Sequence, residues 1–288
     1  MRRRTAAHFD RYAATRAAWR ALSPLYYGTI ERLCRREIPP GARVLEVGCG
    51  VGDLLAAVRP SFGVGIDVSR AMIAEARRRH ASSAPLHFYC ADVHDLALAS
   101  GAPPFDYVIC SDLLGHLADI QVALAAIRRV CSRTAKVVIT YWNFAWQVPL
   151  LLAERVGAKM PQGAQNWLGM ADVDNLLRLT HFETLREGTE ILLPKDVPLL
   201  APLLNRAAIR LPFLDRMGLC TYWVARPAPV PAPAALSTSV IIPCRNEEGN
   251  IPACIDRLPP LGTHTEVIFV DGASTDGTRD RILEQIER

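Results

Sequence analysis

The stretch RVLEVGCGVGD, residues 43–53, joins a short apolar run to a turn that contains three glycines. The apolar run predicts a buried strand. Gly48, Gly50 and Gly52 allow the backbone to turn tightly, to approach a ligand with no Cβ in the way, and to aim amides at that ligand. We therefore expect a ligand at the end of this strand, with a purely structural turn as the alternative.

Further apolar runs follow this strand and alternate with helical patterns. Strands are predicted at 63–68, 86–93, 105–112 and 135–142, and helices at 69–80 and 119–130. Ser69 and Asp119 stand where helix N-caps are expected. Strands that alternate with helices predict an α/β fold, with a parallel sheet covered by helices on both faces.

Two aspartates end strands of this sheet, and ligands of such sheets bind at the carboxyl ends of the strands. Asp67 ends the second predicted strand, about twenty residues after the first, where a carboxylate can accept hydrogen bonds from two ribose hydroxyls. Asp92 ends the third and can face the edge of a base. The strand ends therefore predict a nucleoside site.

The motifs VLEVGCGVGD, GIDVSRAMIAEAR, CADVHDL and FDYVICSDLLGHLAD, in this order, resemble the four nucleotide-site motifs of class I S-adenosylmethionine-dependent methyltransferases. The resemblance covers roughly residues 40–142. A dinucleotide-binding domain would show G-x-G-x-x-G, and here the third glycine falls one position early. The resemblance implies a Rossmann-like, seven-stranded sheet, closed by an antiparallel hairpin of residues 182–188 and 219–226, and S-adenosyl-L-methionine as the cofactor.

The resemblance also implies roles for residues at the strand ends. The implied cofactor contacts are Glu46, Gly48, Cys49, Gly50, Gly52, Asp67, Val68, Asp92, Val93, Cys110 and Ser111. The glutamate and the glycine loop would hold the methionine end, Asp67 the ribose, and Asp92 with the Val93 backbone the adenine. Cys110, Ser111 and Asp112 would border the methyl group and the acceptor. A core position for Cys110 and a helix-cap role for Asp112 are the alternatives.

His116 is the one titratable base candidate next to the predicted site. A neutral imidazole there could deprotonate a hydroxyl acceptor as the methyl group transfers. The alternative is a packing role, since a sulfonium is already activated and alignment supplies much of the rate. Hence His116 is a candidate catalytic residue, and no metal site is predicted.

The segments around the motifs are candidates for the acceptor pocket. Residues 1–40 carry aromatic side chains on helical patterns, and segments at this position form a lid in many members of the family that the motifs resemble. Packing of an amphipathic helix against the body is the alternative. Residues 142–146, 165–168 and 191–204 could line an apolar or sugar-stacking site or belong to the core.

A proline- and alanine-rich stretch separates two modules. Residues 227–236 alternate proline with small residues, which favours an extended linker. We expect a methyltransferase domain at 1–226 and a second segment at 237–288.

The second segment contains STSVIIPCRNEEGN and VIFVDGASTDGT, which resemble the opening of family 2, GT-A fold glycosyltransferases. The implied nucleotide-sugar residues are Pro243, Asn246, Glu247 and Asp271. Gly272 replaces the usual second aspartate. The D-x-D motif, the acceptor region and the catalytic base of that family have no counterpart in residues 237–288. We therefore expect an incomplete segment without glycosyl transfer.

The composition of the chain limits the classes of partner that it is expected to bind. The chain has 33 Lys and Arg against 29 Asp and Glu, and the arginines are scattered rather than gathered into a stripe that would follow phosphates. No nucleic-acid partner is therefore predicted. The first residues lack the pattern of a secretory signal, no apolar run approaches a membrane span, and the eight cysteines show no CxxC spacing. These features predict a cytoplasmic protein with reduced thiols.

The leading interpretation is methyl transfer from S-adenosylmethionine to oxygen. A nucleic-acid methyltransferase is disfavoured, because the chain has no basic stripe and the N/D-P-P-Y/F signature of amino methylation is absent from the CysSerAspLeu region. The acceptor would be a small molecule, a saccharide or a lipid-linked molecule in a pathway linked to glycosyl transfer. The alternative is a non-catalytic module that binds S-adenosylmethionine and tethers a glycosyltransferase.

Overall fold

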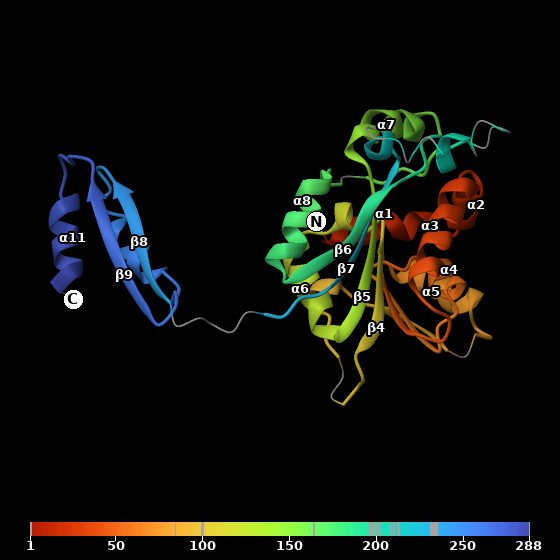
Figure 1. Ribbon diagram of the computed structural model, residues 1–288, viewed down its shortest axis with the longest axis horizontal. Coiled ribbons are helices and arrows are strands. Elements are labelled where there is room, and N and C mark those ends of the chain that lie inside the picture. The colour runs from red at the N-terminus through yellow and green to blue at the C-terminus, as the bar shows by residue number, and fades with distance from the viewer. Residues whose placement is uncertain are drawn as a thin grey trace. The chain divides into compact units, whose positions relative to one another are not determined.

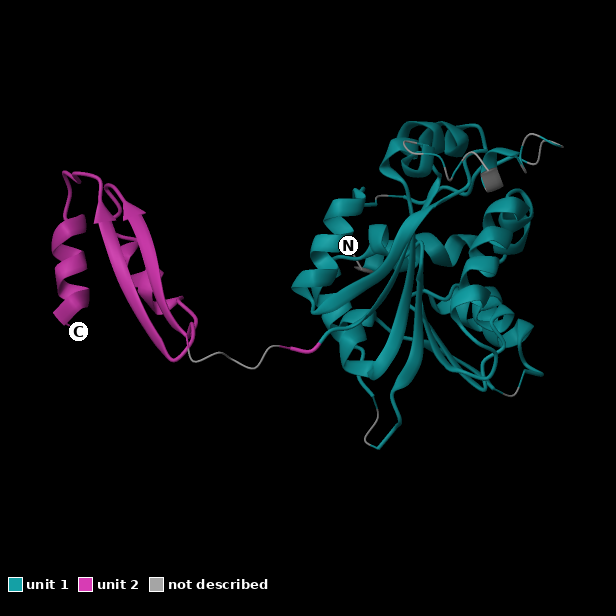
Figure 2. Ribbon diagram, viewed as in Figure 1, with its two compact units in different colours: residues 1–228 teal, residues 229–288 magenta. Residues whose placement is uncertain are grey.

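The computed structural model describes residues 2–287 except 84, 99–100, 164, 196–198, 200, 202, 208, 210, 212–213 and 231–235. The chain forms two compact units, Met1–Ala228 and Pro229–Arg288, called unit 1 and unit 2 below (Figure 2). Half of the predicted linker, 231–235, lies outside the described residues, as does part of the predicted acceptor segment 191–204.

Unit 1 is built on a seven-stranded sheet in the order β3-β2-β1-β4-β5-β7-β6 (Figure 1). Strand β7 runs antiparallel to β5 and β6, and the other neighbours are parallel. The strands are β1 Arg43–Val47, β2 Phe62–Asp67, β3 Leu86–Cys90, β4 Phe105–Ser111, β5 Cys131–Trp142, β6 Phe182–Glu190 and β7 Cys220–Pro227. The sheet confirms the predicted α/β fold and places the switch in strand order between β1 and β4.

Helices cover both faces of this sheet (Figure 1). Neighbouring strand residues point to opposite faces, so Val108 and Cys110 join one core cluster while Ile109 joins the other. The first cluster includes residues of α6 and α8, and the second includes residues of α3, α4 and α5. The helices of unit 1 are α1 Arg2–Tyr12, α2 Arg16–Ala21, α3 Pro24–Glu37, α4 Asp53–Ala57, α5 Arg70–Arg79, α6 Ile120–Val130, α7 Gln147–Arg155 and α8 Met170–Leu179.

Two helices begin where the sequence predicts their caps. The Ser69 hydroxyl accepts a hydrogen bond from the Met72 amide at 3.1 Å, and α5 follows. The Asp119 carboxylate accepts one from the Val122 amide at 2.9 Å, and α6 follows. Each cap satisfies an amide that has no partner within its helix, which typically stabilises a helix by about 1 kcal/mol.

Short turns complete unit 1 at the carboxyl ends of its strands. They are the 3₁₀ turns η1 Val93–Asp95, η2 Leu114–His116, η3 Phe144–Trp146 and η6 Leu214–Arg216, and the π turn η4 Leu203–Ala207. No helix in the described part of the chain is long and apolar enough to cross a membrane. All eight cysteines are free thiols, of which five are buried and Cys90 is exposed.

Unit 2 is a small βαβα arrangement. Its strands β8 Ser237–Cys244 and β9 His264–Asp271 pair in parallel, and its helices are α10 Ile251–Asp256 and α11 Thr278–Glu287. The buried cluster of this unit consists of Cys244, Ile251 and Ile282, with Phe269 packed against it. Ile241 on the sheet is 65% exposed. This unit therefore buries far less apolar surface than unit 1.

Candidate functional site

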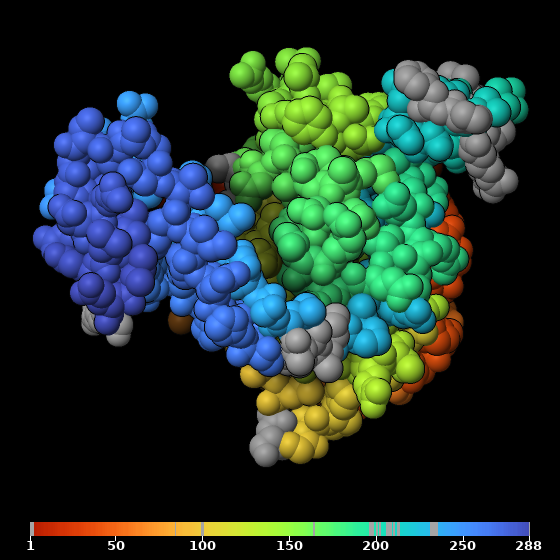
Figure 3. Space-filling view, turned by 60° about the vertical axis from the view of Figure 1, so that its left-hand side comes forward, coloured from red at the N-terminus to blue at the C-terminus, as the bar shows by residue number. Residues whose placement is uncertain are grey.

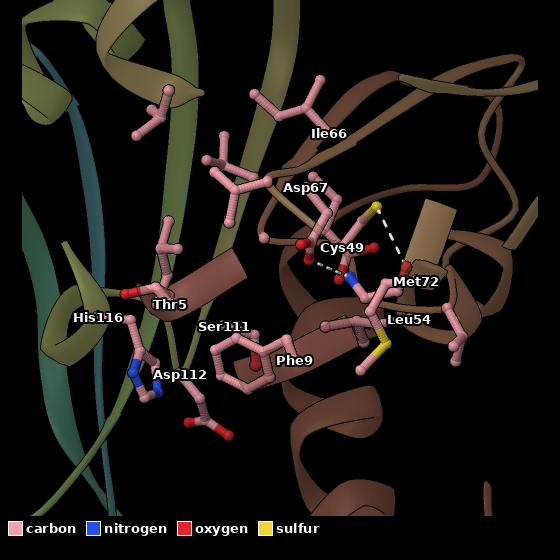
Figure 4. A pocket seen from close by; sticks show the side chains of 18 of the residues that line it. Thr5, Phe9, Cys49, Leu54, Ile66, Asp67, Met72, Ser111, Asp112 and His116 are labelled. Carbon is pink, nitrogen blue, oxygen red and sulfur yellow. Dashed lines mark hydrogen bonds between the residues drawn. The ribbon is translucent and has the colours of Figure 1, made fainter. Parts of the chain in front are cut away.

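One open cleft of about 1310 Å³ lies at the carboxyl ends of β1, β2, β3 and β4. Figure 4 shows Asp67 and Cys49 on one side of it, Asp112 and His116 on the other, and the Phe9 ring of α1 between them. The cleft coincides with the switch in strand order, where ligands of open α/β sheets bind. The topology therefore brings together residues from four strand ends and from the N-terminal helix.

The glycine loop after β1 contributes to the cleft unequally. Gly48 and Gly50 line it, both with positive φ, and a Cβ at Gly50 would meet no atom within 4 Å. Gly52 does not line it, because a Cβ there would lie 2.6 Å from the Phe88 ring. Gly52 is thus required for packing and for its left-handed conformation at the start of α4.

The amides of this loop are bonded within the protein. Those of Gly48 and Cys49 donate to the Ile66 carbonyl at 2.8 and 3.0 Å, and that of Gly50 donates to the Asp67 carboxylate at 2.9 Å. The expectation that these amides are aimed at a ligand is therefore wrong for this structure. The loop offers an open backbone surface instead.

Asp67 is half-buried at the end of β2 and holds the loops on both sides of it. One carboxylate oxygen accepts the Gly50 amide and the other accepts the Ser69 amide at 2.8 Å. Burial raises the pKa of Asp67, while the two amides lower it. Each oxygen keeps a lone pair, so the carboxylate can still accept from two further donors. Val68 follows it and also lines the cleft.

Asp92 after β3 is fixed by a residue that the sequence prediction missed. Its carboxylate accepts the His94 amide at 2.9 Å and lies 2.5 Å from His94 Nδ1. The other ring nitrogen of His94 lies 2.9 Å from the Asp119 carbonyl oxygen. His94 thereby ties η1 to the start of α6. Its place within CADVHDL, two positions after Asp92, is a signal that could have identified it. Val93 is buried and its surface borders the cleft.

Glu46 is a buried carboxyl group in the floor of the cleft, 3% exposed. It accepts the Leu55 amide at 2.9 Å. Burial raises the pKa of Glu46 to about 8, against the lowering effect of the Leu55 amide and of Arg20. An unpaired carboxylate is costly in such a place, so this group favours either a proton or a nearby cation.

Two neighbouring residues at the end of β4 point to different sides of the sheet. The Cys110 side chain is fully buried in the core and does not line the cleft, which corrects its predicted contact, because alternation along the strand turns it toward α6. Ser111 lines the cleft, and its hydroxyl lies 2.9 Å from that of Thr140.

Asp112 faces the cleft and does not cap a helix. Its backbone is left-handed, with φ of 51°, and its carboxylate accepts the Tyr26 hydroxyl at 2.8 Å and the Thr140 hydroxyl at 3.4 Å. Burial raises the pKa of Asp112 to about 6, although Tyr26 and the cations Arg16 and Lys159 oppose that rise. The site therefore contains a carboxylate that can exchange a proton near neutral pH.

His116 ends the 3₁₀ turn η2 and also faces the cleft. The Phe9 ring meets its imidazole edge-on with centroids 5.1 Å apart, and the Gln162 side chain hydrogen-bonds to it. Burial lowers the pKa of His116 to about 4, with the nearby cations acting in the same direction. The imidazole is accordingly neutral at pH 7 and a weak base.

Helix α1 is attached to both walls of the cleft. The Asp10 carboxylate accepts the Ser69 hydroxyl at 2.6 Å and the Ala71 amide at 3.0 Å at the start of α5. On the opposite wall, His8 Nε2 lies 2.9 Å from the Pro161 carbonyl oxygen. Thr5 and Phe9 from the same helix line the cleft. These contacts place α1 across the cleft.

Arginines from α2 add positive charge to the cleft, and the sequence prediction did not single them out. Arg20 contacts Glu31 at 3.3 Å and Asp53 at 3.2 Å and lies over the Tyr27 ring at 4.3 Å. Arg16 lines the cleft and lies 5.6 Å from the same ring. Of the aromatic residues proposed for an acceptor pocket, Trp142 lines the cleft, whereas Trp146 and Trp167 pack on the core.

In unit 2, two loops at the carboxyl ends of β8 and β9 are bonded to each other. The Asp271 carboxylate accepts the Ser274 amide at 3.2 Å and its hydroxyl at 2.5 Å. The Asn246 side-chain oxygen accepts the Thr275 amide at 2.8 Å, and the Glu247 amide donates to the Thr278 hydroxyl at 2.8 Å. These three residues therefore lie together, and they are exposed to solvent. Pro243 lies on β8 opposite Val270.

Comparison with known proteins agrees with this geometry. Residues 45–137 match the family described as methyltransferase domain, and residues 239–287 match glycosyl transferase family 2. The ubiquinone biosynthesis O-methyltransferase of Hahella chejuensis is 32% identical over 134 residues, which are 44% of this chain and 56% of that protein. The chain thus spans about half the length of this curated relative.

Solved structures share the fold of unit 1. A complex of a methyltransferase activator with a methyltransferase from Haloferax volcanii matches at a TM-score of 0.60 and 18% identity, covering 77% of this chain and 98% of that one. An S-adenosylmethionine-dependent methyltransferase from Thermotoga maritima matches at 0.60 and 14% identity, covering 77% and 99%. Unit 1 therefore contains a methyltransferase domain with the fold of class I, S-adenosylmethionine-dependent methyltransferases, fused to a segment that matches glycosyl transferase family 2.

Proposed function

We propose that unit 1 transfers the methyl group of S-adenosylmethionine to a hydroxyl oxygen of a small-molecule, saccharide or lipid-linked acceptor. The observation that carries the proposal is a single cleft with two groups of side chains. Asp67 and Asp92 lie on the nucleoside side, and Asp112 and His116 lie on the other side. The names of relatives such as the Hahella chejuensis O-methyltransferase support oxygen as the methylated atom.

The residues of the first group fit the methyl donor. Asp67 can accept from two ribose hydroxyls, and Asp92 with the Val93 backbone borders the space for the adenine. Glu46 is assigned to the methionine end, where an ammonium group would lower the high pKa of this buried carboxyl. Gly50 leaves the backbone open beside them, whereas a Cβ at Gly48 would lie 2.8 Å from the Leu113 side chain.

Bound S-adenosylmethionine would supply a methyl group on a sulfonium, which is an activated leaving group. The protein then has to align the acceptor oxygen and take its proton. His116 is the predicted base, yet a pKa of about 4 makes it a weak one at neutral pH. Asp112, with a pKa of about 6, is closer to the range in which general bases work best. We therefore propose that Asp112 takes the proton of the acceptor hydroxyl and that His116 positions the acceptor.

We also propose that residues 1–40 act as a lid and that 227–236 is the linker to unit 2. The support for the lid is the attachment of α1 to both cleft walls through Asp10 and His8. The support for a saccharide-related acceptor is the fusion to a glycosyl transferase family 2 segment. Fold and fusion are associations, so the acceptor has to come from experiment.

The test is methyl transfer from labelled S-adenosylmethionine to a cell-envelope extract, with cofactor affinity measured by calorimetry. Asp112→Asn should lower turnover about 100-fold or more with little change in cofactor affinity. His116→Ala should lower turnover less than Asp112→Asn does, and the exposed His264→Ala of unit 2 serves as the control. A loss of about 100-fold in His116→Ala alone would assign the base to His116. Binding without any turnover would favour the tethering module instead.

A further inference from the structure

Helix α7 is apolar on both of its sides. Leu150 of α7 and Trp146 of the preceding turn η3 pack against the core cluster that contains Trp142 and Ile191. On the outer side the exposed fractions are 66% for Val148, 53% for Leu152 and 78% for Val156. A surface helix of a globular protein normally carries polar residues on its outer side. The fold of unit 1 therefore does not account for the outer side of α7.

The exposed apolar surface extends beyond this helix into the segment before β7. Leu199 is 89% exposed, and Leu203, Leu211 and Met217 are exposed as well. We call this surface the apolar rim, and define it by Phe144, Val148, Leu151, Leu152, Val156, Leu199, Leu203, Leu211 and Met217. Monomeric proteins rarely expose large contiguous apolar patches, and such patches mark contacts with a protein or a membrane.

Hydrogen bonds join the two halves of the apolar rim. The Asn143 side chain donates to the Arg216 carbonyl at 2.7 Å, and the Trp146 indole donates to the Met217 carbonyl at 2.8 Å. Within the second half, Asn205 bonds to the backbone of Leu193 through both ends of its amide, at 2.8 and 3.0 Å. Figure 3 shows α7 and the segment before β7 at the same end of unit 1. The rim is thus one surface rather than scattered side chains.

Among the described residues, the charges on this surface are mainly positive. Arg155, Lys195 and Arg216 are exposed, with Asp215 the exposed acid beside them. Glu154 is already engaged, because it forms an ion pair with Lys159. Cations at the border of an apolar surface suit the anionic headgroups of a lipid bilayer. A second copy of the same surface would bring these cations against one another, which disfavours self-association.

The apolar rim lies next to the cleft. Strand β5 ends at Trp142, which lines the cleft, and the rim begins two residues later at Phe144. Beyond α7 the chain returns to the cleft at Gln162. A surface resting on a bilayer through the rim would hold the cleft near amphiphilic molecules in that bilayer.

We propose that the apolar rim docks unit 1 on an anionic bilayer surface, without crossing it, and thereby gives the cleft access to a lipid-linked acceptor. The identity of the acceptor rests on the function proposed above. The docking itself does not, because it involves neither the cofactor nor turnover. The expected bound state is interfacial, with the rim side chains among the headgroups and the three cations at their phosphates.

The test uses the full chain and flotation with vesicles of phosphatidylcholine, with or without phosphatidylglycerol. We expect binding to vesicles that contain phosphatidylglycerol and a loss of about tenfold or more in Val148→Glu/Leu152→Glu. The matched control is Val122→Glu/Leu179→Glu, which places the same charges at exposed apolar positions of α6 and α8, 46% and 54% exposed. Cofactor affinity, measured by calorimetry, should be unchanged in both pairs.

Further variants separate the bilayer from other partners. Arg155→Glu/Lys195→Glu should reduce binding to vesicles with phosphatidylglycerol, and added salt should reduce binding of the unmodified chain. Ile241→Glu in unit 2 should leave binding intact, since Ile241 is exposed outside the rim. The proposal is overturned if the control pair weakens vesicle binding as strongly as the rim pair, or if only Ile241→Glu abolishes that binding. It is also overturned if the rim instead joins two copies of the chain into a dimer without lipid, at the same protein concentration.

Discussion

Asp67 of unit 1 and Asp271 of unit 2 occupy comparable places, each at the end of the second of two paired parallel strands. Both accept an amide from a serine a few residues later, at 2.8 Å from Ser69 and 3.2 Å from Ser274. Asp67 is half-buried, and burial raises its pKa, whereas Asp271 is exposed. The same strand-turn-helix sequence therefore positions a carboxylate in both units, but its electrostatic environment depends on the helices and strands around it.

The cores of the two units differ in the same way. Unit 1 buries large side chains on both faces of its seven-stranded sheet, and the described part of unit 2 buries three hydrophobic residues beside two strands. Small domains bury a lower fraction of their surface and are correspondingly marginal. We expect unit 2 to depend on each of its buried side chains, and unit 1 to tolerate the loss of one.

The largest expected effect is the unfolding of unit 2 by Ile282→Ala. Ile282 is one of the three buried hydrophobic residues described in this unit, and removal of a buried Ile side chain commonly costs about 2–5 kcal/mol. Amide hydrogen exchange should show loss of protection in β8 and β9. Ile127→Ala, at a fully buried position of unit 1, is the control and should leave unit 1 folded. Retained protection in unit 2 would show that its core is not limiting.

The next largest effect is a difference in cofactor affinity between variants of the two aspartates. Asp67→Ala should weaken S-adenosylmethionine binding by roughly 1.5–3 kcal/mol, the scale of charge-assisted hydrogen bonds lost at a half-buried site. Asp271→Ala should leave that affinity unchanged. Calorimetry on both variants measures the difference. Equal affinities for Asp67→Ala and the unmodified chain would remove the ribose assignment.

A smaller effect concerns the dependence of stability on pH. Because Glu46 has a pKa of about 8 in the folded state against an ordinary value of 4.5, the stability that it contributes as a protonated group is full below about pH 4.5. That contribution is lost as the pH rises through about 8. Glu46→Gln should therefore melt about 2 °C or more above the unmodified protein at pH 9, with no gain at pH 4.5.

The control for this pH effect is Glu284→Gln in unit 2, where the side chain is 58% exposed and paired with Arg281. Thermal melts of both variants at pH 4.5, 7 and 9 make the comparison. A gain at pH 9 in Glu284→Gln equal to that in Glu46→Gln would contradict burial as the cause.

The smallest expected effect is that of removing unit 2. A chain that ends at Ala228 should keep the cofactor affinity and the melting temperature of unit 1. The cut follows Ala228 because its amide donates to His181 and its carbonyl accepts from Arg128, at 2.8 and 2.7 Å. A fall of several degrees in the melting temperature would show that the two units stabilise each other.

Much of the sheet could be predicted from the sequence, because its strands are apolar runs that end in recognisable turns. Ser69 and Asp119 also revealed their helix starts, since capping is a local interaction. The antiparallel pairing of β6 with β7 came from the family resemblance, and the pairing of β7 with β5 was not predicted. Strand pairing joins segments that lie far apart in the chain. Local sequence patterns therefore do not show which strands pair with each other.

The part of the site that could be predicted consists of polar residues at or near the ends of strands. Asp67, Asp92 and Glu46 lie at the cleft, as their motifs suggested. The contacts to Asp112 from Tyr26, and to His116 from Gln162, could not be predicted, because they join segments that only folding brings together. The misplacement of Cys110 has a different cause. Adjacent strand residues face opposite sides, and a motif does not state which one faces the ligand.

Helix α1 has a consequence for the order of events at the cleft. Because Asp10 bonds to Ser69, and the Ser69 amide bonds to Asp67, helix α1 and the carboxylate proposed to bind the ribose share one residue. If α1 acts as the lid proposed above, release of the demethylated product should require these bonds to open. We expect a compulsory order in which the donor binds before the acceptor, with a slow final step. Initial-rate patterns and single-turnover measurements on Asp10→Ala would show whether that step accelerates.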